Sequence, residues 1–192
     1  VGPTDLHAML RGHDQSVMDL LEAPERAERL LWQLGEVFCA ITDAAWEQIP
    51  LYHGGYYDAQ YQLWAPGPIA RMQEDASGLY SPSLYRQFVQ PVDRMIAARY
   101  PCAFIHLHST SMFLLDAFLE VQGIRCFEVN YEVISGGPPI AGMIPYFRQI
   151  QDAGRPLLVR GSFTPEELQA LTEALDPRGL YLYIMVETMD EV

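Results

Sequence analysis

Lysine is absent from this sequence: all 12 basic side chains among its 192 residues are arginines. That absence excludes, within these residues, a Schiff-base lysine, a P-loop lysine and a kinase-type lysine. Basic residues are also few beside the 25 acidic ones, and the formal net charge is −13. Because such a chain lacks the basic surface that binds DNA or RNA phosphates, we expect no nucleic-acid partner.

Cysteine and long apolar runs are scarce as well. The three cysteines, Cys39, Cys102 and Cys126, are odd in number and lie in apolar segments, which is typical of reduced, buried thiols. No apolar run approaches the ~20 residues of a membrane span. We therefore expect no membrane association, no leader segment and a cytoplasmic location.

Strand-like and helix-like patterns alternate along most of the chain. After an irregular start over 1–22 and a long helix from Pro24, strands are predicted at 69–75, 102–109, 124–131, 156–161 and 180–186. Strands separated by helices indicate a parallel sheet with helical crossovers. A (β/α)8 TIM barrel, an α/β fold, typically needs ~250 residues. We therefore expect one domain over 1–192 that holds the C-terminal two-thirds of a barrel and lacks its N-terminal units.

Two further features of the chain bear on its ligands. No glycine-rich fingerprint follows any predicted strand, so no nucleotide cofactor is expected. Residues 50–68 are rich in aromatic residues, glycine and proline, and we predict a long structured loop there. His53 and Tyr57 in this loop are candidates for binding a flat ligand, the alternative being that the loop simply packs over the barrel.

The segment CAFIHLH at 102–108 contains the best candidate site. Side chains alternate along a strand, so Phe104, His106 and His108 share one face while Ile105 and Leu107 share the face that packs on helices. Two imidazoles on one strand face can reach one ion, and imidazole suits zinc, iron or copper. The alternative is a pair of hydrogen-bonded interior histidines.

The next predicted strand supplies polar residues to the same face. Glu128 and Asn130 alternate with apolar residues and point inward, where they need partners. We predict that Glu128 is a third metal ligand, with an acceptor that orients a histidine or an arginine partner as its alternatives. Asn130 is assigned to substrate binding.

Charged residues also end two other strands. Glu74 and Asp75 close the first strand, where carboxylates are placed for acid–base catalysis, although a solvated or capping role fits equally. Arg160 ends the strand at 156–161 and is assigned to holding a substrate carboxylate, against a structural ion pair.

Several segments resemble a known family. GPTDL at 2–6, DLLEAPE at 19–25, the acidic pair at 74–75 and LYSPSLYRQFVQP at 79–91 are similar to the uroporphyrinogen decarboxylase superfamily, which includes zinc-dependent corrinoid:coenzyme M methyltransferases. The resemblance implies a single TIM barrel. In the methyltransferase branch one strand carries His-x-Cys as two zinc ligands, and His106 and His108 occupy that position here. The third ligand of that branch, a cysteine in a Gly-Cys-Gly turn, has no counterpart in this sequence, so Glu128 is its predicted substitute.

The resemblance implies a function and partners that the residues alone do not. We expect a divergent zinc-dependent methyltransferase that transfers a methyl group from a corrinoid, held by a corrinoid protein, to a thiol. Alternatives are a carboxy-lyase acting on a tetrapyrrole, with Glu74 or Asp75 in proton transfer, and a non-catalytic tetrapyrrole-binding paralogue. A homodimer is compatible with an exposed barrel edge.

Overall fold

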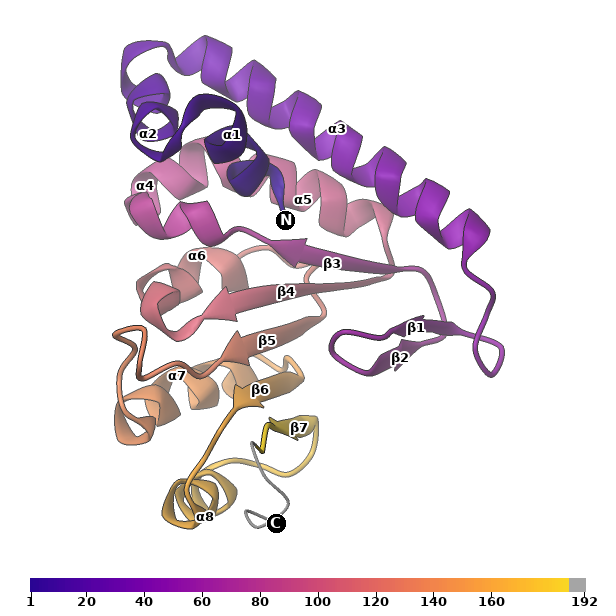
Figure 1. Cartoon of the computed structure of the whole chain (residues 1–192), viewed down its shortest axis with the longest axis vertical. Coiled ribbons are helices and arrows are strands. Elements are labelled where there is room, and N and C mark those ends of the chain that lie inside the picture. Colours follow the sequence, from indigo (N-terminus) through magenta and orange to yellow (C-terminus); the bar gives the residue numbers. More distant parts are fainter. Residues whose placement is uncertain (187–192) are drawn as a thin grey trace.

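The computed structural model describes residues 1–186, which form helices around one five-stranded parallel sheet (Figure 1). The strand order β3-β4-β5-β6-β7 is also the order along the chain. The α/β class and the parallel sheet predicted from the sequence are therefore confirmed. The strands are β3 (Ile69–Gln73), β4 (Cys102–His108), β5 (Cys126–Asn130), β6 (Leu157–Gly161) and β7 (Leu180–Ile184).

Helical segments connect each strand to the next, and the right-handed rule for such crossovers places them on one face of the sheet. The largest hydrophobic cluster supports this one-sided arrangement, because it joins side chains of these helices to one set of alternating strand residues. The connecting segments are η1 (Asp75–Leu79), α4 (Pro82–Leu84), η2 (Tyr85–Val89), α5 (Gln90–Arg99), η3 (Ser109–Leu114), α6 (Leu115–Leu119), α7 (Ile140–Asp152) and α8 (Pro165–Ala174).

Alternation along the strands divides the sheet into two unlike faces. Ile105 and Leu107 of β4 belong to the large cluster with the helices, as the sequence predicts. Phe104 instead packs in a smaller cluster with Tyr61 and Leu158 on the opposite face. We call the first the helix face and the second the inner face, and the candidate site lies on the inner face.

The N-terminal segment corrects one expectation. Residues 1–22 are not irregular but form α1 (Pro3–Arg11) and α2 (His13–Glu22), which pack on the long helix α3 (Pro24–Gln48). Pro3 occupies the first turn of α1, and the Asp5 carboxylate accepts the Gly2 N–H at 2.9 Å, so the helix start is capped. Gly12, with φ of 86°, separates the two helices in a conformation that favours glycine.

The segment at 50–68 is a second correction, because it is not a loop throughout. It contains an antiparallel hairpin of β1 (Tyr56–Asp58) and β2 (Leu63–Ala65), with Tyr57 opposite Trp64. The Asp58 carboxylate accepts the backbone N–H groups of Gln60 and Tyr61, and this turn closes the hairpin. The turn also brings Tyr61 onto the inner face of the sheet.

Over residues 1–186 the sheet is open, with β3 and β7 as its two edge strands. The TIM barrel therefore stays a prediction, whereas the five-stranded parallel sheet is observed. None of the helices described combines the length and the apolar character that crossing a bilayer requires. Of the three cysteines, Cys39 is buried while Cys102 and Cys126 are half-buried, and all three are free thiols.

Candidate metal centre

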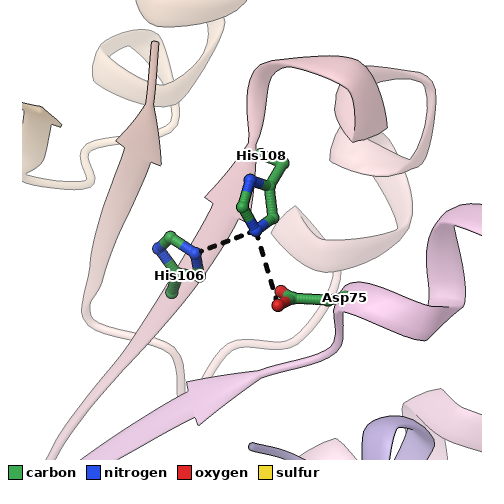
Figure 2. Close-up of side chains that lie close together, drawn as sticks. All are labelled: Asp75, His106 and His108. Carbon is green, nitrogen blue, oxygen red and sulfur yellow. Dashed lines mark hydrogen bonds and ion pairs between the residues drawn. The ribbon is translucent and has the colours of Figure 1, made fainter. Parts of the chain in front are cut away.

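The two histidines of β4 lie side by side at the carboxyl end of the sheet (Figure 2). His106 is only 5% exposed, whereas His108, one pleat further along, is half-buried. Their Nε2 atoms are 3.3 Å apart, and the ring planes are nearly perpendicular at 79°. The strand pleat thus presents the same nitrogen of both rings to one small space, as the alternation in the sequence predicts.

A carboxylate from the neighbouring strand completes this group. Gln73, the last residue of β3, pairs in register with His106, so Asp75 reaches the level of His108. The Asp75 Oδ2 atom lies 3.4 Å from His108 Nε2 and also accepts a hydrogen bond from the Gln73 side chain at 2.6 Å. One ligand atom from each of Asp75, His106 and His108 lies within 4.8 Å of the others.

Each histidine is held from behind by a carboxylate. His106 Nδ1 hydrogen-bonds to the Glu128 carboxylate, and the Tyr61 hydroxyl lies 3.0 Å from the same nitrogen. His108 Nδ1 is 2.7 Å from Glu132 Oε2. Because a carboxylate accepts the Nδ1 proton, each Nε2 is directed away from its carboxylate and presents a lone pair there whenever the ring is neutral. This is the arrangement by which proteins orient histidines toward metal ions.

The charges in this group depend strongly on one another. The hydrogen bond to Asp75, followed by the one to Glu132, raises the pKa of His108 to about 9. Burial alone would raise the pKa of Asp75, but the hydrogen bonds from His108 and Gln73 bring it below its ordinary value. Burial raises the pKa of Glu128 despite the opposing effect of His106. A cation that binds the histidine nitrogens must therefore displace a proton from His108.

The donor set fits a tetrahedral divalent metal ion. With metal–ligand bonds of about 2.0–2.1 Å, the ligand atoms of a tetrahedral zinc site lie about 3.3–3.4 Å apart. The Nε2–Nε2 separation of 3.3 Å and the Nε2–Oδ2 separation of 3.4 Å match this spacing, whereas Asp75 lies farther from His106, within 4.8 Å but outside ion-pair distance. Two imidazoles and a carboxylate also suit zinc or iron better than they suit calcium or magnesium.

Glu128, predicted as the third ligand, lies on the Nδ1 side of the His106 ring, away from His108. Its side chain is fully buried and contacts Nδ1, not the space between the two Nε2 atoms, and Asp75 occupies the position expected of it. The register explains this placement, because Glu128 pairs directly with His106 across the strands. Its carboxylate therefore orients the ring, which is one of the two alternatives to ligation that the sequence leaves open.

Glu74, predicted as catalytic together with Asp75, lies on the helix face instead. Its side chain is 3% exposed and accepts the Thr4 backbone N–H at 2.8 Å. Burial, reinforced by the charge of Asp93 on α5, raises the pKa of Glu74 well above its ordinary value. β3 ends at Gln73, two residues earlier than predicted, and Glu74 and Asp75 leave the turn into η1 in different directions, so only Asp75 reaches the site.

The predicted substrate-binding residues divide into two groups. Asn130 donates to Glu132 and lies 3.4 Å from Nη1 of Arg160, so both belong to the same inner-face network as His108. Tyr57 is half-buried in β1 and lines a separate groove against α3. His53 is exposed at the turn before β1, with its ring against Tyr52.

Two residues of the network were missed at the sequence level. Glu132 continues the alternation of Glu128 and Asn130, and that period of two was the signal that could have found it. Tyr61 offered no such signal, because only the hairpin turn brings it against His106.

Comparisons with protein-family models, curated proteins and solved structures find no match to this chain.

Proposed function

We propose that this chain is a metal-dependent enzyme whose centre is one divalent transition-metal ion, most simply zinc, bound by Asp75, His106 and His108. One observation carries the proposal: two Nε2 atoms and a carboxylate oxygen converge while carboxylates hold both Nδ1 atoms. A structural histidine pair needs neither two such supports nor a third anionic group beside the two Nε2 atoms.

The number of ligands favours catalysis over a structural role. Structural zinc sites are usually closed by four protein ligands, whereas catalytic sites keep a position for water or substrate. Three protein groups converge here, and the side chains of His108 and Asp75 are 29% and 34% exposed. A fourth position on an ion held by these residues would therefore be open to solvent at the carboxyl end of the sheet, where barrel enzymes bind their substrates.

We further propose that the sheet is an arc of a (β/α)8 barrel. Its support is the sequential order of five parallel strands, with the connecting helices on one face and polar side chains on the other. A doubly wound fold would instead reverse its strand order and place helices on both faces. The inner-face position of His106 and His108 is what a barrel interior requires.

The reaction class comes from the resemblance to the methyltransferase branch. A bound zinc ion would act as a Lewis acid that lowers the pKa of a thiol ligand. The thiol releases its proton to solvent, a sulfur–carbon bond forms to the methyl group, and the bond between methyl and carrier breaks with its electron pair left on the carrier. Glu128 and Glu132 keep the two imidazoles oriented throughout.

The carboxy-lyase alternative has less support among the described residues. It assigns proton transfer to Glu74 or Asp75, but Glu74 is turned to the helix face and Asp75 is engaged with His108.

Metal content tests the proposal directly. The purified chain is freed of metal with a chelator, loaded with zinc, desalted and measured by elemental mass spectrometry. We expect about one zinc per chain, lost in His106→Ala/His108→Ala and retained in the control His53→Ala, whose ring is exposed outside the network. A folded wild-type chain that holds no zinc, or a double variant that keeps it, would contradict the proposal.

A further inference from the structure

Arg160 on β6 is a cation without an anionic partner among residues 1–186. Its side chain lies on the inner face, yet no carboxylate of the described residues comes within 4.0 Å of it. Its Nε atom is buried and has no hydrogen-bond acceptor. A buried donor of a charged group without an acceptor is costly, which is the condition that a bound anion relieves.

Aromatic rings flank the Arg160 guanidinium. Its central carbon is 5.9 Å from the ring centre of Tyr61 and 5.8 Å from that of Tyr183. Nη1 makes a long contact of 3.4 Å to the Asn130 side-chain oxygen. The rings restrain the guanidinium and supply apolar surface, and the long contact to Asn130 is its one hydrogen bond among the described residues.

The same residues connect Arg160 to the proposed metal ligands. His108, Asn130, Arg160 and Tyr183 pair in register as one row across four adjacent strands. Asn130 donates to Glu132, which contacts His108, and the Tyr61 hydroxyl contacts His106. Two strand spacings separate Arg160 from His108, about 10 Å between backbones. One small molecule can span that distance.

We propose that Arg160, with Tyr61, Tyr183 and Asn130, is a subsite for the carboxylate of a small substrate whose reacting group lies at the metal centre. The inference rests on the proposed function for its second half, the position of the reacting group. A carboxylate is favoured over a phosphate because a single arginine balances one negative charge, and the neighbouring Glu128 and Glu132 repel a dianion more strongly.

Arg71 provides a matched control. It also lies on the inner face, with its central carbon 6.0 Å from the Tyr61 ring centre. Unlike Arg160, it donates to Gln60 at 2.7 Å and pairs with Asp58 at 3.4 Å. Both arginines therefore carry a positive charge near the Tyr61 ring. They differ in that protein groups already accept hydrogen bonds from Arg71, whereas Arg160 has only the long contact to Asn130.

Ligand-detected NMR titrations test the subsite with propionate, its neutral analogue propionamide, and inorganic phosphate. We expect propionate to bind the wild type, and to bind Arg160→Gln about tenfold or more weakly. Arg71→Gln should bind as the wild type does, and Arg160→Lys should recover part of the loss because it keeps the charge without the planar pair of donors. Circular dichroism establishes that each variant is folded.

Three results would overturn the subsite: equal propionate binding by the wild type and Arg160→Gln, equal binding of propionamide, or tighter binding of phosphate than of propionate. Each titration is performed on metal-free and on zinc-loaded protein. Binding that depends on Arg160 in a chain unable to hold zinc would remove the proposed function and leave the carboxylate subsite. If the chain binds zinc but propionate binds equally to the wild type and Arg160→Gln, the carboxylate subsite is removed and the proposed function remains.

Discussion

Glu74 and Asp75 are neighbours in the chain with opposite environments. Glu74 lies on the helix face among buried groups, where it accepts the Thr4 N–H and faces Asp93. Asp75 lies on the inner face, half-exposed, between Gln73 and His108. Burial raises the pKa of Glu74 well above its ordinary value, whereas the pKa of Asp75 is lowered by the side chains that contact it.

The comparison shows that the face of the sheet decides what a carboxylate can do. On the helix face, Glu74 and Asp93 lie near each other away from water, and burial raises the pKa of both carboxyl groups. On the inner face, carboxylates contact imidazoles, which lowers the pKa of Asp75, opposes the effect of burial at Glu128 and lets these groups orient or ligate. Both environments occur beside the end of one strand. A role predicted for an acidic pair in a sequence therefore has to be tested separately for each of its two residues.

The largest expected effect is a difference in zinc affinity between variants of Asp75 and of Glu74. Asp75→Asn removes an anionic ligand, and we expect zinc to bind at least ~100-fold more weakly, as measured by competition with a chromogenic chelator. Glu74→Gln is the matched control and should leave zinc affinity within about twofold, because its side chain lies on the other face. Equal losses in both variants would show that the two faces are not independent.

A smaller effect is expected from the carboxylates behind the histidines. Glu128→Gln and Glu132→Gln each remove the anionic acceptor of an Nδ1 proton, and such changes typically weaken metal binding about 10–100-fold. The same chelator competition measures them. If either variant loses zinc as completely as Asp75→Asn does, that glutamate is a ligand rather than an orienting group.

The smallest effect concerns stability on the helix face. Burial raises the pKa of Asp93 to about 7, and the Tyr85 hydroxyl donates to it at 2.5 Å. The folded chain therefore binds this proton more tightly than the unfolded chain, so stability is lost as the pH rises from about 4 to about 7. Asp93→Asn cannot ionise and can still accept from Tyr85, so we expect it to unfold at a temperature a few degrees higher at pH 8.

Thermal unfolding at pH 5 and pH 8 measures this difference, with the exposed Asp152→Asn as control. The advantage of Asp93→Asn should be larger at pH 8 than at pH 5. A variant that is less stable at pH 8, or whose advantage does not change with pH, would show that Asp93 is not a strained acid in the folded chain.

The sequence predicted the elements whose patterns are local and regular. Alternation placed His106 and His108 on the inner face and Ile105 on the helix face, because a strand buried on both sides leaves only two directions for a side chain. The same rule, applied to residues 73–75 and 128–132, separates Glu74 from Asp75 and adds Glu132. These assignments were within reach of the sequence.

Other parts of the structure depend on contacts between distant segments. The hairpin of β1 and β2 has strands of only three residues each, too short for a periodic signal, and its turn determines where Tyr61 lies. α1 is secured by η1 through hydrogen bonds from Thr4 to Glu74 and from Ala76 to Asp5. Hydrogen bonds between residues ~70 positions apart produce no local sequence pattern, so they could not be predicted from the sequence.

The pairing of His106 with Glu128 and of His108 with Asn130 also limits how the gene can change. Deleting one codon of β4 ahead of His106 would turn the imidazoles toward the helices and Leu107 toward the inner face, because side chains in a strand have only two orientations. Deleting one codon in the loop at 133–139 leaves every strand register intact. Length variation is therefore tolerable in that loop and forbidden within β4, whatever substitutions either segment accepts.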